Sequence, residues 1–305
     1  MRSPSAVYRP PSVVLFCDNG FSPVEVDETY RNEYKTSKEI GFNVSLISFE
    51  ALKEGNLHIA LKRIKPSIEL KQAIYRGWML KPFEYKALYE ALLQRNIQLI
   101  NTPDQYQFCH YLPNSYTSIE AFTPKTIFKK LNGEFDIADF NAELEVFGHS
   151  SIIVKDYVKS QKHYWTEACF IPDASDRKQV KKVVKRFLEL QGDDLNEGLV
   201  FREFVELEQL TTHSKSGMPL TKEFRLFIKD GEIIAQFNYW DEGDYENVQP
   251  DLTRFKELIP TIQSRFFTMD IAKKVGGDWI IVELGDGQVA GLPDNADIVS
   301  FYNTL

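Results

Sequence analysis

Two carboxylates close a hydrophobic run near the C-terminus of this 305-residue chain. The segment reads Asp278-Trp-Ile-Ile-Val-Glu283-Leu-Gly-Asp286-Gly287, which leaves Leu-Gly between Glu283 and Asp286. Carboxylate oxygens at the end of a strand are ligands that a hard cation such as Mg²⁺ prefers, and they can hold it beside a phosphate group. The segment is therefore a candidate metal site if other residues supply cations for phosphate.

Glu283 alternates with Ile281 and Trp279, so we expect all three on one face of a strand. A carboxylate bracketed by apolar side chains needs a partner, which is either a metal ion or a base such as Arg225 or a lysine. Asp270 is a second candidate metal ligand, and the alternative for it is an acid associated with a helix.

Three basic residues could meet phosphate oxygens. Lys155 ends the run that starts at Ser151, and Lys159 follows within a few residues. Arg225 projects opposite an apolar stripe in the strand expected at 222–229, and a guanidinium suits bidentate binding of phosphate or carboxylate. The stripe consists of Phe224, Leu226 and Ile228. The alternatives are two surface lysines and a salt bridge on the sheet.

The strand expected at 199–205 runs into acidic residues, Glu203 and Glu206. Where the chain stops pairing, exposed backbone N–H and C=O groups can bond a purine edge. The side chains that could cover the faces of the purine are Phe201, Phe204 and Val205. The alternative is an edge strand with solvated acids.

The common sequence motifs of nucleotide-binding proteins and hydrolases are absent. There is no GxxxxGK[ST] loop, no GxGxxG after a strand and no GxSxG elbow. The five histidines are scattered, and Cys17, Cys109 and Cys169 form no CxxC pair, which argues against a disulfide framework and a structural zinc site.

Composition narrows the class of protein. Charged residues are 26% and hydrophobic residues 43%, as in ordinary globular proteins. The net charge of -8 argues against nucleic acid or an anionic membrane as the main partner. The chain has no apolar run of membrane-spanning length, and its N-terminus lacks the apolar core of a signal peptide. We therefore expect a cytoplasmic protein.

Strands and helices alternate over the first 100 residues, which predicts a small parallel α/β domain. The expected strands are 13–17, 44–49, 73–79 and 97–100, and the expected helices are 25–40 and 83–95. Gly41 is placed to cap the first helix. Residues 101–150, rich in Pro, Tyr, Asn and Ser, resemble a connecting region.

The second half of the chain predicts a mixed α+β unit. The expected strands are 152–157, 199–205 and 279–284, and the expected helices are 176–190 and 262–275. Asp230-Gly231 separates two alternating runs, 223–229 and 232–240, which is a strong signal for a β-hairpin.

The order of these features resembles the ATP-grasp superfamily over about residues 100–295. The motifs Lys155-Asp-Tyr-Val-Lys159-Ser, Glu223-Phe-Arg225 and Glu283-Leu-Gly-Asp-Gly-Gln-Val289 resemble a RimK-related clade of bacteria and phages, whose members are proposed peptide or amine ligases. The resemblance implies an α/β + α+β fold. A pre-ATP-grasp domain (1–100) would precede a two-lobed ATP-grasp domain (101–305), with 101–150 as the connecting region.

The resemblance also implies roles for individual residues. Phosphate oxygens of ATP would meet Lys155, Lys159 and Arg225, of which Lys155 and Arg225 would be catalytic. The hinge that binds adenine would comprise Glu203, Phe204, Val205 and Glu206. The Mg²⁺ ligands would be Asp270, Glu283 and Asp286. The family has asparagine where this chain has Gly285, so either Asp286 replaces that ligand or a second metal site is missing.

The implied activity is an ATP-dependent carboxylate–amine ligase that acts through an acylphosphate, with ATP, Mg²⁺ and an amino acid, peptide or protein as partners. No protein nucleophile is required. Residues 223–227 also resemble a eukaryotic ATP-grasp protein that assists assembly of translation initiation factor 2. The alternative is therefore an ATP-binding assembly or regulatory protein without ligase activity, and a third possibility is a protein that binds no nucleotide. Residues 76–78 are a candidate part of the substrate pocket.

Overall fold

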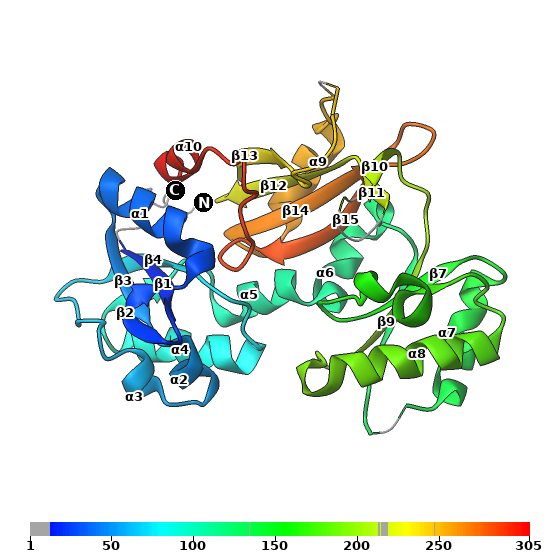
Figure 1. The fold of residues 1–305 in the computed structure, drawn as a ribbon, viewed down its shortest axis with the longest axis horizontal. Helices are drawn as coiled ribbons and strands as arrows, with labels where there is room; N and C mark the ends of the chain where they lie inside the picture. The colour runs from blue at the N-terminus through cyan, green and yellow to red at the C-terminus, as the bar shows by residue number, and fades with distance from the viewer. Residues whose placement is uncertain (1–12, 134, 213, 215–218, 247) are drawn as a thin grey trace, which may run out of the picture.

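The structure is a computed structural model that describes residues 13–133, 135–212, 214, 219–246 and 248–305. The first 12 residues, where the sequence predicts no signal peptide, and His213 lie outside the described residues. Figure 1 shows an N-terminal unit on the left and two further sheets on the right, joined by α5 and α6. Within the described residues, no helix combines the length and the hydropathy of a membrane span.

The N-terminal sheet has the order β3-β1-β4-β5, and these four strands run parallel. Their bounds are β1 Val13–Asn19, β3 Asn43–Ile47, β4 Lys71–Arg76 and β5 Ile97–Leu99. A short strand, β2 (Ser22–Val26), pairs antiparallel with the end of β1. This arrangement confirms the predicted parallel α/β unit.

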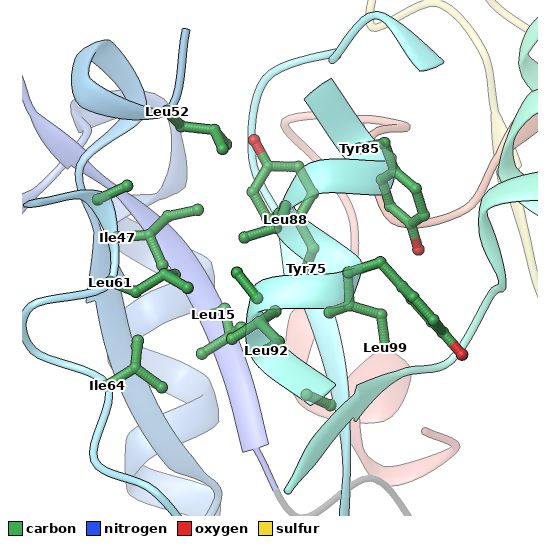
Figure 2. Close-up of a cluster of buried hydrophobic side chains, with 14 of the residues drawn as sticks. Leu15, Ile47, Leu52, Leu61, Ile64, Tyr75, Tyr85, Leu88, Leu92 and Leu99 are labelled. Atoms are coloured by element: carbon green, nitrogen blue, oxygen red, sulfur yellow. The ribbon is translucent and has the colours of Figure 1, made fainter. Parts of the chain in front are cut away.

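Helices cover both faces of the N-terminal sheet, which explains why the first five residues of β1, 13–17, are all apolar and buried. The helices α2 (Phe49–Lys53), α3 (Leu57–Ala60) and α4 (Pro82–Leu93) cover one face, and Figure 2 shows the cluster of Leu, Ile and Tyr side chains between them and the strands. The opposite face packs on α1 (Arg31–Ile40), after a short η1 (Glu28–Tyr30), and on α10 (Ile298–Asn303). Gly41 ends α1 with a φ of 106°, as predicted.

The middle sheet is antiparallel, with the order β6-β9-β7-β8. Its strands are β6 Thr126–Lys130, β7 Ile152–Asp156, β8 Phe170–Ile171 and β9 Gly198–Glu203. The amphipathic helix α8 (Arg177–Gln191) packs on one face, against Val154 and Phe201 among others. Alternation therefore turns Lys155 and Arg202 to the opposite face.

The C-terminal sheet is antiparallel, with the order β13-β12-β14-β15. Its strands are β12 Glu223–Lys229, β13 Glu232–Asn238, β14 Phe266–Lys273 and β15 Trp279–Asp286. The predicted hairpin is confirmed: Asp230 and Gly231 both have positive φ, 49° and 88°, which is typical of a type I′ turn. The apolar stripe of Phe224, Leu226 and Ile228 packs into one core, as expected.

The predicted helix at 262–275 is wrong, because residues 266–273 form the central strand β14. Seven consecutive residues, from Phe266 to Ala272, are buried. A strand that is covered on both faces shows no apolar–polar alternation, so its periodicity cannot be told from that of a buried helix. Asp270 is consequently a strand residue and not an acid associated with a helix.

A β-bulge in β15 turns Glu283 away from the face that the alternation predicts. Asp270 pairs with Glu283, whereas Ile271 pairs with Ile281, so Val282 is an extra residue in β15. Ile281 packs into the core with Ile271, and Glu283 lies on the opposite face, beside Asp270. The expectation that Glu283 shares a face with Trp279 and Ile281 is therefore wrong.

Two helices, α5 (Pro103–His110) and α6 (Leu112–Ile119), lie between the sheets and contact β15. The remaining strands and helices are shorter and lie around the sheets. They are η2 Glu120–Phe122, η3 Ile137–Phe140, α7 Asn141–Leu144, η4 Glu145–Phe147, η5 Lys162–Tyr164, the π-helical η6 Trp165–Cys169, η7 Gly192–Asp194, β10 Gln209–Thr212, β11 Pro219–Thr221, α9 Thr253–Leu258 and η8 Ile259–Thr261.

Arg76, at the end of β4, ties the N-terminal sheet to the C-terminal segment. Its guanidinium is fully buried, pairs with Glu33 at 2.8 Å, and donates to the carbonyl oxygens of Gly287 (2.8 Å), Gln288 (3.1 Å) and Ala290 (2.8 Å). This network fixes the segment after β15 against the N-terminal unit, so the end of β15 has a defined position in the whole molecule.

Candidate active site

Four charged side chains from two sheets meet at one place. The register of the C-terminal sheet puts Arg225 of β12 opposite Asp270 of β14, and Asp270 opposite Glu283 of β15. The Arg225 guanidinium donates twice to Asp270, at 2.8 and 2.7 Å. Lys155 of the middle sheet reaches across and donates to Glu283 Oε2 at 3.0 Å. Two carboxylates therefore lie side by side with a cation at each end, and we call Arg225, Asp270, Glu283 and Lys155 the charged row.

The two carboxylates respond differently to this environment. Burial raises the pKa of Asp270, and Arg225 only partly opposes that effect while Glu283 adds to it. Burial also opposes ionisation of Glu283, but Lys155 and Arg225 outweigh burial and lower its pKa. Two acids that face each other across neighbouring strands would be stabilised by a divalent cation between them.

A cavity of about 100 Å³ opens over these residues, and it is lined by Lys155, Arg225, Asp270 and Glu283 among others. A larger cleft of about 590 Å³ adjoins it. The two share lining residues: Met79, His110, Val158, Val289 and Gly291. The charged row thus forms the floor at one end of a continuous concave region.

Lys159 lies in the larger cleft, outside the cavity that holds Arg225 and Glu283. The loop that carries it is held by Asp156, whose side chain is fully buried and accepts from the backbone N–H groups of Val158 (2.7 Å) and Lys159 (2.5 Å). Asn196 and Gln191 donate to the same carboxylate, at 2.9–3.0 Å. Asp156 therefore fixes the direction in which this loop leaves β7.

The segment 203–206 links the middle sheet to the C-terminal sheet. Phe204 packs edge-on against Trp165 and Phe170, with ring centroids 5.8 and 5.1 Å apart. Among the described residues, none hydrogen-bonds to the Val205 backbone N–H, and the segment lines neither of the two cavities. The structure does not bring Glu203, Phe204, Val205 and Glu206 together with the charged row, although it leaves a backbone donor available on the segment.

The Asp286 carboxylate is engaged in hydrogen bonds at the junction with the N-terminal unit. The residue is 1% exposed, and its carboxylate accepts from Asn101 Nδ2 at 2.6 Å and from the Gln288 backbone at 3.0 Å. Burial raises the pKa of Asp286 to about 7. Gly285 precedes it, and a side chain there would lie 2.8 Å from Thr268 Oγ1. A metal-binding role for Asp286 stays a prediction that these contacts do not favour.

Substitution of Asp286 separates the packing role from the metal-binding role. Because the folded-state pKa is raised to about 7 from 3.8, the folded protein binds a proton that the unfolded chain releases, and this stabilising contribution is lost as pH rises through 7. We expect the free energy of unfolding to fall on the order of 3 kcal/mol more between pH 5 and 8 in the wild type than in Asp286→Asn.

Urea denaturation at several pH values measures this difference, and calorimetry with ADP and Mg²⁺ on the same two proteins supplies the comparison. The packing role predicts ADP affinities within about twofold of each other. A large loss of Mg²⁺-dependent affinity in Asp286→Asn, with an unchanged pH slope, would instead make Asp286 a metal ligand.

Sequence reasoning missed a second group of residues on the same face of the C-terminal sheet. Glu223 lies two positions before Arg225, and burial raises its pKa to about 7. The Tyr239 ring lies 4.8 Å from the Arg225 guanidinium carbon, and Lys162 of the middle sheet's loop lies 4.9 Å above the Trp240 ring. Strand parity with Arg225 could have identified Glu223, whereas nothing in the sequence places Lys162 over Trp240.

The residues of the candidate substrate segment 76–78 lie in different surroundings. Arg76 is engaged in the buried network described above, whereas Trp78 lines the larger cleft. A Cβ on Gly77 would lie 2.4 Å from Cys17 Sγ and 2.5 Å from the Tyr75 ring, so only glycine fits between the two.

Comparisons with known proteins bear on this arrangement. A search of curated proteins finds no match to this chain. A solved RimK-domain ATP-grasp protein from Sphaerobacter thermophilus is 12% identical with a TM-score of 0.57, and the alignment covers 96% of this chain and 97% of that one. D-cycloserine synthetase DcsG is 12% identical with a TM-score of 0.60, covering 96% and 98%. The ATP-grasp ligase PsnB, solved with a minimal precursor, Mg and ADP, is 12% identical with a TM-score of 0.57, covering 98% of each chain.

These structural likenesses, at such low identity, show the fold alone. They confirm the α/β unit followed by a two-lobed ATP-grasp unit. The model of the family described as an ATP-grasp domain of R2K clade family 3 matches residues 143–305, more than half of the chain. The matched region contains Lys155, Arg225, Asp270 and Glu283, and the chain belongs to this R2K clade family of ATP-grasp proteins.

Proposed function

We propose that this protein is an ATP-dependent carboxylate–amine ligase. The observation that supports the proposal most strongly is the row Arg225–Asp270–Glu283 across three strands, met by Lys155 from the opposite sheet. Ligases are among the solved structures with the same fold, including DcsG and PsnB.

The donor set fits Mg²⁺ held together with a nucleotide. Magnesium takes oxygen ligands and is usually bound by one or two carboxylates plus phosphate oxygens. Asp270 and Glu283 supply two carboxylates in direct register. The described residues contain no group of three or more His, Cys, Asp or Glu side chains that could hold a metal. We therefore propose that Asp270 and Glu283 hold Mg²⁺ only when phosphate oxygens complete its shell. Asp286 lines the same cavity, but its carboxylate accepts from Asn101 and Gln288, and we propose that it is not a ligand.

The observed ion pairs supply the cations for phosphate. Lys155 pairs with Glu283, and Arg225 pairs with Asp270. A metal ion bound to the two carboxylates would replace Lys155 and Arg225 as their partners. Both cations could then contact phosphate oxygens. When bound, Mg²⁺ would neutralise charge on the phosphates. Lys155 and Arg225 are thus the residues proposed to be catalytic.

The adenine would lie toward the link between the sheets. The backbone N–H of Val205 has no hydrogen-bond partner among the described residues and offers a donor for a purine edge. We propose that Glu203, Phe204 and Glu206 also belong to the adenine site. Glu223 lies two positions before Arg225 on β12, Tyr239 lies against Arg225, and Lys162 lies over the Tyr239 ring. We propose that these three side chains line the path of the ribose and phosphates.

Ligation requires two displacements. An oxygen of the substrate carboxylate attacks the γ-phosphorus of ATP, the bond to the β–γ bridging oxygen breaks, and ADP leaves. An amine nitrogen then attacks the acyl carbon of the acylphosphate, the C–O bond to phosphate breaks, and the amine loses a proton as the amide forms. The chain's contribution is alignment and charge stabilisation, and no covalent protein intermediate is needed.

Binding and turnover test the proposal in sequence. Calorimetry with AMPPNP should show binding with Mg²⁺ and a loss of at least about tenfold in affinity with EDTA. A panel of carboxylates with ATP, Mg²⁺ and hydroxylamine as a general amine should yield ADP, phosphate and a hydroxamate for an accepted acid. Mg²⁺-dependent binding with no turnover across the panel would favour the ATP-binding assembly or regulatory protein, and no binding at all would contradict both functions.

A further inference from the structure

The larger cleft of about 590 Å³ lies beside the charged row, and the proposed roles above leave most of it unassigned. Loops of the N-terminal sheet form one side, and Lys159, Asp194 and Asn196 form the other. Because the cleft shares His110 and Val158 with the smaller cavity, a molecule bound there can extend one end toward Lys155 and Glu283.

Sheet topology favours a ligand in this place. The chain passes from β1 to β3 on one side and then to β4 on the other side of β1. In open parallel sheets, ligands bind outside the carboxyl ends of the strands at the point where the strand order reverses. Trp78 follows the carboxyl end of β4 and Phe49 follows that of β3, and both line the cleft.

The wall on this side is aromatic and accessible. Trp78 and Met79 are 42% and 44% exposed although they line a concave surface. The Trp78 indole is held in place, since its Nε1 donates to Asp27 at 3.1 Å and its ring packs edge-on against Tyr30 at 5.9 Å. Fixed aromatic surface in a concave site is suited to an apolar group of a ligand.

The charge in the cleft favours an anion. Three lysines line it, and only Lys53 is paired, with Glu84 at 2.7 Å. Lys81 Nζ donates to the Asp193 carbonyl at 3.0 Å, and no described carboxylate forms a salt bridge with Lys81 or Lys159. The lining contains a single acid, Asp194. The cleft therefore carries a local positive excess in a protein whose net charge is -8.

His110 stands where the cleft meets the cavity. Its ring packs on Tyr106, with centroids 4.9 Å apart. Burial, aided by Lys159 and Lys155, lowers the pKa of His110 to about 3, so the imidazole is neutral and can donate or accept a hydrogen bond without adding charge.

We infer that this cleft binds the carboxylate substrate, and that this substrate is a carboxylic acid with an aromatic or large aliphatic body. The body lies on Trp78 and Met79, and the carboxylate points toward Lys159 and His110, at the entrance to the cavity of Lys155 and Arg225. This inference rests on the proposed ligase function, because that function requires an acid to approach the γ-phosphate.

Three small probes test the inference on the full chain by calorimetry, with and without ADP and Mg²⁺. They are 3-phenylpropanoate, acetate and phenethylamine. We expect 3-phenylpropanoate to bind at least about tenfold more tightly than either of the other two. Trp78→Ala should weaken this binding by about tenfold, whereas Phe83→Ala, which removes a 68% exposed ring outside the cleft lining, should not change it.

Each opposite outcome overturns the inference. Equal binding of acetate and 3-phenylpropanoate would remove the apolar wall from recognition, and tighter binding of phenethylamine would assign the cleft to the amine. An unchanged ADP affinity in Trp78→Ala would show that its nucleotide site is intact, so that weaker acid binding in this variant is assigned to the cleft. A wild type that binds ADP but not the acid would count against the cleft alone. If the wild type did not bind ADP at all, this result would count against the proposed function instead.

Discussion

Glu283→Gln should weaken Mg²⁺-dependent ADP binding by at least about 100-fold, because it removes one of the two carboxylates proposed to hold the metal. Glutamine keeps the shape and one oxygen but loses the negative charge that Lys155 now meets at 3.0 Å. The same substitution should reduce the ratio between the affinities measured with Mg²⁺ and with EDTA to near one, since the metal would no longer contribute to binding.

Glu246→Gln is the matched control. Glu246 accepts from a lysine at 3.3 Å, as Glu283 does at 3.0 Å, but its side chain is 70% exposed and lies away from the cavity. Its affinity for ADP with Mg²⁺ should stay within about twofold of the wild type. If Glu283→Gln and Glu246→Gln had equal effects on calorimetric affinity, Glu283 would have no special place in nucleotide binding.

Arg225→Met should lower the free energy of unfolding by about 3–5 kcal/mol and abolish nucleotide binding. The guanidinium makes two hydrogen bonds to Asp270, whose side chain is 3% exposed, so its removal leaves a buried carboxylate without its partner. The double variant Arg225→Met/Asp270→Leu replaces the pair with apolar groups and should regain most of the lost stability. It should still bind no nucleotide.

A second arginine–aspartate pair, on the hairpin turn of the same sheet, provides the control. Arg265 Nε lies 2.8 Å from Asp230, with side chains 41% and 33% exposed, and solvent weakens such a pair. Arg265→Met should cost less than about 1 kcal/mol in urea denaturation. A small cost for Arg225→Met, or retained AMPPNP binding in the double variant, would contradict the assigned role of Arg225.

Local pattern was sufficient to predict much of the fold. The β12–β13 hairpin followed from Asp230-Gly231, and the two faces of β12 followed from alternation, so Arg225 could be separated from its apolar neighbours in advance. Lys155 was predicted at the end of a strand, and β7 indeed contains it. In each case, residues close in the sequence determine the outcome.

Long-range features could not be predicted in the same way. β12 and β15 pair with the two edges of β14, and other parts of the chain pack on its faces, so residues 266–272 are all buried. Nothing within residues 262–275 reveals those neighbours. The bulge at Val282 is stabilised from the middle sheet, where Arg202 donates to the carbonyls of Ile281 and Val282. The contacts of Asp286 likewise depend on Asn101, which lies 185 positions away in the sequence.

A crystal structure with AMPPNP and Mg²⁺ tests the central claim most directly. We expect a metal ion coordinated at about 2.1 Å by oxygens of Asp270, Glu283 and the phosphates, with Lys155 and Arg225 in contact with phosphate oxygens in place of their present carboxylate partners. A nucleotide bound elsewhere, or phosphates bound here with no metal on Asp270 and Glu283, would contradict the account.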